Sequence, residues 1–147
     1  LVTRVAYIKK GASRRFVIVD AAMNDLLRPS LYQAHHEIVP VEVAASIAKR
    51  EVYDVVGPVC ETGDVIATDR WLAPVATDDL LAVSCAGAYG AVMASGYNSR
   101  LLVPEVLVNC DQFTVVRPRQ TYEEMLSQEK FPPWLKDGPR TKTSGSV

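Results

Sequence analysis

Cysteine is scarce in this sequence, with three residues in 147, and histidine is scarcer still, with two. Cys60, Cys85 and Cys110 lie far apart and form no Cys-x-x-Cys pair, which argues against a disulfide framework and against a zinc site. His35 and His36 are adjacent, too close for two ligands on one face of a strand, and we interpret both as surface or interface residues. We therefore expect reduced thiols and no bound metal.

An excess of positive charge is also absent, and so is any long apolar run. The formal net charge is −1, which leaves no surplus of Lys and Arg to follow a phosphate backbone. No apolar run approaches the ~20 residues that a membrane helix needs. We expect a soluble, cytoplasmic protein that binds neither nucleic acid nor membrane.

The length suits one domain with a core of its own. The hydrophobic share of 48% and the charged share of 22% are those of an ordinary globular protein. The chain starts at Leu1 and passes directly into a strand-like run, so we interpret it as a fragment of a longer protein. We expect a folded domain over residues 1–135 and a flexible tail over residues 136–147, which are polar and lack periodicity.

Short β-branched runs separated by turn residues make up most of the chain, a pattern typical of an all-β sandwich or barrel. We expect a mainly β fold, a Greek-key-like barrel or sandwich with a few short helices. A hairpin is expected where residues 105–108 and 113–116 flank Asp111-Gln112. The expected strands lie near residues 2–9, 14–20, 36–45, 53–60, 64–72, 79–86, 105–110 and 113–118.

Helix is expected only in short pieces. A turn or two should follow Pro29, and another should follow Gly87. A better helix is expected over residues 122–129, where Thr121 and Glu124 form a capping-box pattern. Helices therefore contribute little to the expected core.

Two connections, residues 21–35 and 87–104, are longer than the others, and long connections on a β scaffold often carry function. In the first, Pro29 favours a helical turn that begins near Arg28, with Tyr32 one turn later. A guanidinium and a phenol would then converge on one space, a pairing suited to a carboxylate. The alternative is an arginine that caps local carbonyls and a tyrosine that packs on the barrel, and the spacing alone favours this alternative.

A second candidate site follows the strand-like run that Pro58 interrupts and Gly63-Asp64 ends. Side-chain alternation can fail beside a turn, so the thiol of Cys60 and the carboxylate of Glu61 would point into one cavity or one interface. A thiol is a usable proton donor near neutral pH, and a carboxylate suits a cationic amine. The alternative is that Cys60 fills the core and Glu61 is solvated.

The second long connection is rich in small residues around a single tyrosine, Tyr89. Gly87 and Gly90 permit close approach of the backbone to another surface, and Tyr89 would offer its hydroxyl to a phosphate or carboxylate. The stretch matches neither a dinucleotide fingerprint nor a Walker loop. Close packing of a turn against the barrel explains it equally well.

Taken in order, these segments resemble the diaminopimelate decarboxylases, and three ordered matches are far more specific than any one. The resemblance runs from about Val2 to about Leu135, and the parts near residues 105–108 and 121–126 resemble the family's C-terminus. Ala22 and Thr62 depart from the common Gly and Ser without removing a charge or the hydroxyl. The matching stretches are VIVDAAMNDLLRPSLY (17–32), VGPVCETGD (56–64) and GAYGA (87–91).

The resemblance implies a two-domain enzyme that converts meso-diaminopimelate to L-lysine and CO₂. An N-terminal (β/α)₈ barrel, which this sequence lacks, would carry pyridoxal 5'-phosphate on a lysine, and this C-terminal β-domain would close the site. On its own, this chain should neither bind the cofactor covalently nor decarboxylate. The enzyme would be a homodimer with shared active sites.

The resemblance also implies roles for five residues. Those matching Arg28 and Tyr32 would hold the distal carboxylate of the substrate, and Tyr89 would contact the substrate and the cofactor phosphate. Cys60 and Glu61 would reach into the site of the partner subunit. There Cys60 would donate a proton to the α-carbon, and Glu61 would bind the distal amino group.

Two other functions stay open. A related decarboxylase of ornithine, lysine or arginine would use the same cofactor, but its substrate has no distal carboxylate for Arg28 and Tyr32 to bind. A non-catalytic β-module would only mediate dimerisation or regulate a homologous enzyme. The sequence immediately upstream of Leu1 would distinguish a catalytic enzyme from the non-catalytic β-module.

Overall fold

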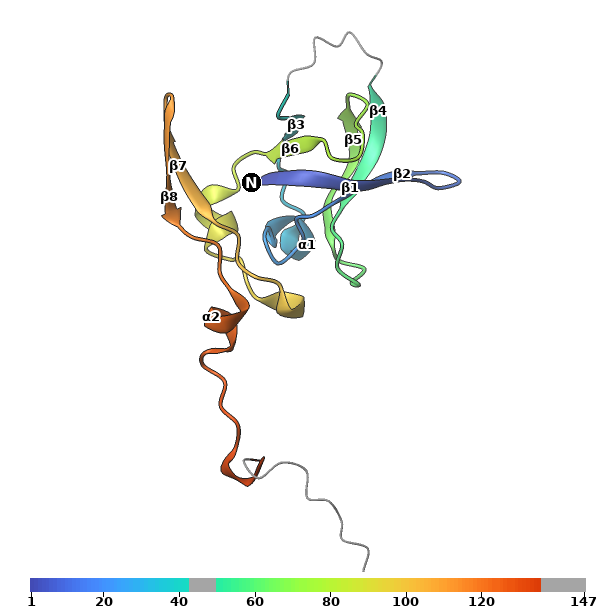
Figure 1. Ribbon diagram of the computed structural model, residues 1–147. Helices are drawn as coiled ribbons and strands as arrows, with labels where there is room; N and C mark the ends of the chain where they lie inside the picture. The colour runs from blue at the N-terminus through green and yellow to red at the C-terminus, as the bar shows by residue number, and fades with distance from the viewer. Residues whose placement is uncertain (43–49, 136–147) are drawn as a thin grey trace, which may run out of the picture. The chain divides into compact units, whose positions relative to one another are not determined.

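The computed structural model describes residues 1–42 and 50–135 (Figure 1). The end of the expected strand 36–45 and the expected tail 136–147 lie outside the described residues. The chain forms two compact units, Leu1–Val103 and Pro104–Val147. Within the described ranges, no helix is long and apolar enough to cross a membrane.

The first unit is built on a six-stranded sheet that curves into a nearly closed barrel, which confirms the expected mainly β fold. The strand order is β3-β6-β1-β2-β4-β5, and every neighbouring pair is antiparallel except β2 with β4. The strands are β1 (Val2–Lys10), β2 (Arg15–Val19), β3 (Ile38–Pro40), β4 (Glu51–Val56), β5 (Val65–Leu72) and β6 (Leu80–Val83).

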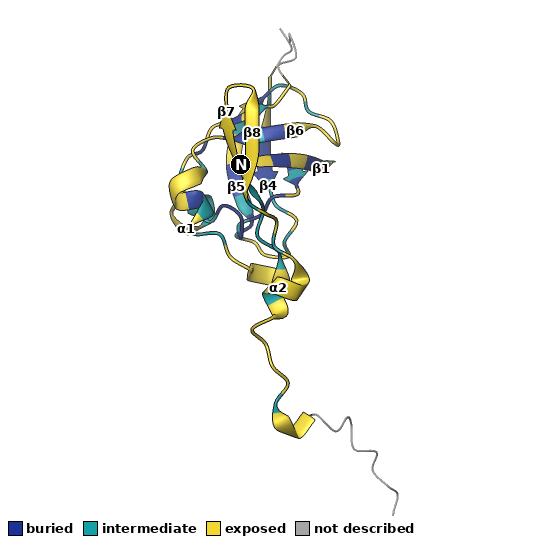
Figure 2. Ribbon diagram, turned by 60° about the vertical axis from the view of Figure 1, so that its left-hand side comes forward, coloured by how far each residue is buried: buried dark blue, intermediate teal, exposed yellow. Residues whose placement is uncertain are grey.

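The core follows from the twofold alternation of side chains along each strand. On β2, Val17 and Val19 are fully buried, and the residue between them is only half-buried. Leu26, from the connection after β2, is fully buried in the same cluster. Figure 2 shows this buried layer along the strands. The first long connection is therefore anchored in the core immediately before Arg28.

Short helical turns occupy both long connections, as expected. Helix α1 (Arg28–Tyr32) has a proline in its first turn and ends at Gln33, whose φ of 59° is left-handed. A π-helical turn, η1 (Gly87–Ala91), and a 3₁₀ turn, η2 (Tyr97–Ser99), lie in the second connection. The connections thus carry compact turns on which side chains can be fixed.

The two adjacent histidines differ in environment. His35 is exposed and lies 2.7 Å from Arg70, measured from Nη1 to Nδ1. His36 is buried, and its Nδ1 lies 2.9 Å from the carbonyl oxygen of Ser84. The expected surface or interface position is therefore wrong for His36, because this residue is buried within the chain just before β3.

The second unit contains the expected hairpin of β7 (Glu105–Asn109) and β8 (Gln112–Arg117), followed by α2 (Tyr122–Leu126) and η3 (Pro133–Leu135). The expected turn at Asp111-Gln112 is wrong by one residue, because Gln112 pairs with Asn109 and the turn is Cys110-Asp111. The capping box is confirmed, since Thr121 Oγ1 accepts from the Glu124 amide at 3.1 Å and a Glu124 carboxylate oxygen accepts from the Thr121 amide at 2.8 Å. The helix ends at residue 126 rather than 129. The Ser127 hydroxyl there donates to the Glu124 carbonyl, a local bond that competes with helix continuation.

Candidate functional site

Arg28 lies beside two tyrosines from the two long connections. Its Nε donates a hydrogen bond to the Tyr32 hydroxyl at 2.7 Å. Its Cζ lies 5.7 Å from the ring centroid of Tyr32 and 5.9 Å from that of Tyr89. A guanidinium over an aromatic face is attracted by the ring quadrupole. The structure therefore brings together three of the five residues proposed for the site, and we call them the Arg28 cluster.

The terminal nitrogens of Arg28 are left available. Among the described residues, no carboxylate pairs with Arg28, and neither Nη atom donates a hydrogen bond. Tyr32 is 51% exposed and Tyr89 is 67% exposed, so the cluster opens to solvent. A planar fork held in orientation by its Nε and by two rings is suited to bidentate binding of a carboxylate. The alternative that Arg28 caps local carbonyls is not what the structure shows.

Helix α1, which carries Arg28 and Tyr32, is fixed at two points. Leu26, buried in the core, precedes it, and the Ser30 hydroxyl donates to the carbonyl of Gly63. Gly63 belongs to the loop that joins β4 to β5. The helix is therefore tied to the loop that contains Cys60 and Glu61.

Cys60 and Glu61 are both exposed in that loop. The expected strand 53–60 is wrong beyond Val56, where β4 ends. Glu61 accepts a hydrogen bond from the Gly63 amide at 3.1 Å and one from the Tyr97 hydroxyl at 3.4 Å. No described hydrogen bond or ion pair joins Cys60 or Glu61 to the Arg28 cluster of the same chain.

The loop turns around the buried carboxylate of Asp64, a role that sequence reasoning missed. One oxygen accepts from the Val59 amide at 2.7 Å, and the other accepts from the Met23 amide at 2.7 Å. A Cβ on Gly57 would overlap the Asp64 carboxylate, so only glycine leaves room for that group. Strand β4 ends here because Pro58 has no amide hydrogen and the Val59 amide is taken by a side chain.

Replacing Gly57 with alanine should destabilise the chain by about 1–3 kcal/mol, because backbone or carboxylate must move to admit the Cβ. The free energy of unfolding in urea measures this loss. Gly87→Ala is the matched control, since nothing lies within 4 Å of a Cβ at that position. Equal stability of the two variants would show that Asp64 does not constrain the loop.

Three polar residues that the sequence did not single out tie the two long connections together. Asn24 and Asp25 are buried, and Arg100 reaches both of them. Burial is the main reason why the pKa of Asp25 is raised, and hydrogen bonds together with the charge of Arg100 oppose the rise. Asn24 and Asp25 fall within a motif of the sequence, but no local pattern links them to a residue more than seventy positions later.

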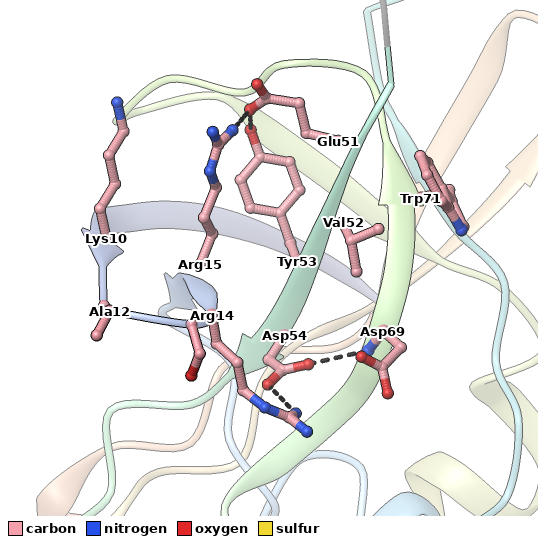
Figure 3. Close-up of a pocket in the computed structure, with 12 residues that line it drawn as sticks. Lys10, Ala12, Arg14, Arg15, Glu51, Val52, Tyr53, Asp54, Asp69 and Trp71 are labelled. Carbon is pink, nitrogen blue, oxygen red and sulfur yellow. Dashed lines mark hydrogen bonds and ion pairs between the residues drawn. The ribbon is translucent and has the colours of Figure 1, made fainter.

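A hollow lies elsewhere, between the β1–β2 turn and strands β4 and β5 (Figure 3). Two of its acidic groups already have partners: Arg14 bonds to Asp54 at 2.6 Å, Arg15 pairs with Glu51, and Asp54 also accepts from the Asp69 amide at 2.9 Å. None of the five proposed site residues lines it. We therefore do not place the functional site in this hollow.

A family model described as the pyridoxal-dependent decarboxylase, C-terminal sheet domain, matches residues 1–87. The chain is 50% identical to the diaminopimelate decarboxylase of Zymomonas mobilis over 92% of its own length and 31% of that protein. It is 51% identical to the enzyme of Pseudomonas aeruginosa over 90% of its length and 31% of that protein. The chain thus spans about a third of the length of these curated relatives.

Solved structures agree with these matches. The chain is similar to diaminopimelate decarboxylase from M. jannaschii in co-complex with L-lysine, with a TM-score of 0.85, 36% identity, and coverage of 92% of this chain and 30% of that one. A likeness to the arginine decarboxylase of a Chlorella virus has a TM-score of 0.61 and 14% identity, over 67% of this chain and 27% of that one. The second likeness shows the fold alone.

Proposed function

This chain belongs to the C-terminal sheet domain family of the pyridoxal-dependent decarboxylases, and on that premise we propose that it serves a diaminopimelate decarboxylase. The resemblance noted in the sequence is confirmed by relatives of about 50% identity. The proposed reaction, carried out by a longer parent protein, converts meso-diaminopimelate to L-lysine and CO₂. The observation that carries the proposal is the oriented guanidinium of Arg28, whose terminal nitrogens make no hydrogen bond within residues 1–42 and 50–135.

Arg28 and Tyr32 are proposed to bind the distal carboxylate of the substrate. The two Nη groups supply a fork for its two oxygens. The Tyr32 oxygen accepts from Arg28 Nε, so the phenolic hydrogen remains available for donation to the same carboxylate. Because these donors are fixed before substrate arrives, little ordering is required on binding.

Tyr89 is proposed to contact both the substrate and the cofactor phosphate. Its exposed hydroxyl has no hydrogen-bond partner in the described part of the chain, and its ring lies near the positive charge of Arg28. A free donor beside a cation fits a phosphate oxygen. When bound, pyridoxal 5'-phosphate supplies the electron sink that lets CO₂ leave the α-carbon. The lysine that holds the cofactor is proposed to lie in the parent, outside this chain.

Cys60 and Glu61 are proposed to act in the site of a partner subunit. Both are exposed, and neither bonds to the Arg28 cluster of its own chain, which supports a role across a homodimer interface. The Cys60 thiol would donate the proton that replaces the departed carboxyl group. The Glu61 carboxylate would bind the ammonium group at the distal carbon.

A substrate panel with the purified parent tests this function. Turnover of meso-diaminopimelate is expected, with ornithine, lysine and arginine far poorer substrates because they leave the Arg28 fork unpaired. Comparable turnover of ornithine or lysine would move the function to the related decarboxylases. Absence of any decarboxylation by cofactor-loaded parent would favour the non-catalytic module.

A further inference from the structure

The two long connections are closed against each other by one arginine. Arg100 Nε donates to the side-chain oxygen of Asn24 at 2.8 Å, and its Nη2 donates to the Asp20 carbonyl at 2.5 Å. The same Nη2 lies 3.6 Å from the carboxylate of Asp25. All three partners belong to residues 20–25, in the connection that leads to Arg28. One side chain thus bridges the end of the second connection to the beginning of the first.

Asn24 extends this bridge along the second connection. Its side-chain amide donates to the Ser95 carbonyl at 3.2 Å, and its own carbonyl accepts from the Ser95 amide at 2.9 Å. Asn24 is 2% exposed, so these bonds are shielded from water. The bonds of Asn24 and Arg100 together form a clasp between residues 20–25 and 95–100.

Tyr89 depends on this closure for its place beside Arg28. It lies on η1, whose Gly90 packs so closely on Leu26 that a Cβ would come within 3.2 Å of the leucine side chain. The Tyr89 side chain is largely exposed, and in the described part of the chain its hydroxyl makes no hydrogen bond that would fix it. Its 5.9 Å approach to Arg28 is therefore set by how the two backbones are joined.

We propose that Arg100 is a positioning residue for substrate binding, which acts by holding Tyr89 against Arg28. The inference rests on the proposed function, in which Arg28 binds the distal carboxylate. Arg100 makes no described contact with Arg28, Tyr32 or Tyr89, so it acts only through the clasp. The buried carboxylate of Asp25 makes the clasp dependent on charge, because removing Arg100 leaves that group without its cation.

The test is a cycle of variants in the full-length, cofactor-loaded parent. Arg100→Ala is expected to raise KM for meso-diaminopimelate about tenfold, since small misplacements of binding groups are costly, and to change kcat less. In a Tyr89→Ala background the same change should raise KM no further, because the side chain that Arg100 positions is gone. An equal factor in both backgrounds, or an unchanged KM in Arg100→Ala, would overturn the proposal.

Two further variants separate positioning from folding. Arg100→Lys keeps the charge near Asp25 but loses the planar guanidinium, so it should fold and should raise KM less than Arg100→Ala does. Arg4→Ala is the matched control, because Arg4 makes one exposed side-chain bond, to the Asp78 carbonyl, and should leave KM unchanged. If Arg28→Ala itself has no effect, the proposed function fails, whereas an effect of Arg28→Ala without one of Arg100→Ala rejects only the role of Arg100.

Discussion

Arg28→Ala in the parent protein is expected to raise KM for meso-diaminopimelate by about 100-fold, with a much smaller change in kcat. The side chain is proposed to make two charge-assisted hydrogen bonds to the distal carboxylate, each worth ~1.5 kcal/mol, and every ~1.4 kcal/mol is a factor of ten. The distal carboxylate lies away from the reacting carbon, so the loss should fall on binding. Initial-rate kinetics of the purified variant measure both constants.

Two variants sharpen this result. Arg28→Lys keeps a positive charge without the planar fork, and its KM should lie between those of wild type and Arg28→Ala. Tyr32→Phe removes the hydroxyl that accepts from Arg28 Nε at 2.7 Å, and should raise KM by a smaller factor. A KM for Arg28→Ala within twofold of wild type would remove the assigned role of the Arg28 cluster.

Cys60→Ala is expected to lower kcat by about 100-fold to 1000-fold, because a positioned proton donor contributes that much to a proton-transfer step. KM should change little, since the thiol is proposed to meet the α-carbon only after CO₂ has left. Single-turnover and steady-state rates of CO₂ and lysine formation measure the effect. A change confined to lysine formation would locate the defect at the proton-donating step.

The chain provides a matched control for this thiol. Cys85 is also exposed, and it has a left-handed φ of 55°, at which alanine is no more strained than cysteine. Cys85→Ala should therefore retain wild-type kcat. If both variants, or neither, lost activity, Cys60 would have no specific part in proton donation.

Local signals in the sequence predicted local structure well. The capping box of Thr121 and Glu124 involves residues three apart, and the β7–β8 hairpin is set by a turn between adjacent strands. The one-turn spacing of Arg28 and Tyr32 likewise predicted their contact, because Pro29 favours the helical turn between them. In each case the interaction depends only on neighbours in the chain.

Longer-range interactions escaped the same reasoning. The strand expected over 53–60 stops at Val56 because Asp64 binds amides on both the Val59 and Met23 segments, a clamp that no local pattern reveals. The clasp of Arg100 spans 76 positions to Asn24. In the sequence, Asp64, Asn24 and Arg100 look like ordinary polar loop residues. Only the folded chain shows which groups they bind.

The proposed sharing of each site between two subunits cannot be seen in a single chain. The Arg28 cluster is assembled within one copy, whereas the exposed Cys60 and Glu61 are not joined to it. The homodimer that we propose takes residues of each site from both subunits. A shared site predicts that two inactive variants regain activity when their subunits are mixed. A site with all five residues in one subunit does not predict this.

Mixing subunits tests that prediction most directly. Two variants of the parent are used, one with Arg28→Ala and one with Cys60→Ala, and each alone should be nearly inactive at a substrate concentration near the wild-type KM. The two variants are unfolded, mixed in equal amounts and refolded together with cofactor. Random pairing of two-fold dimers gives half heterodimers, each with one intact site, so about a quarter of wild-type activity should return. Formation of heterodimers, followed with two affinity tags, without any regained activity would contradict sites built from both subunits.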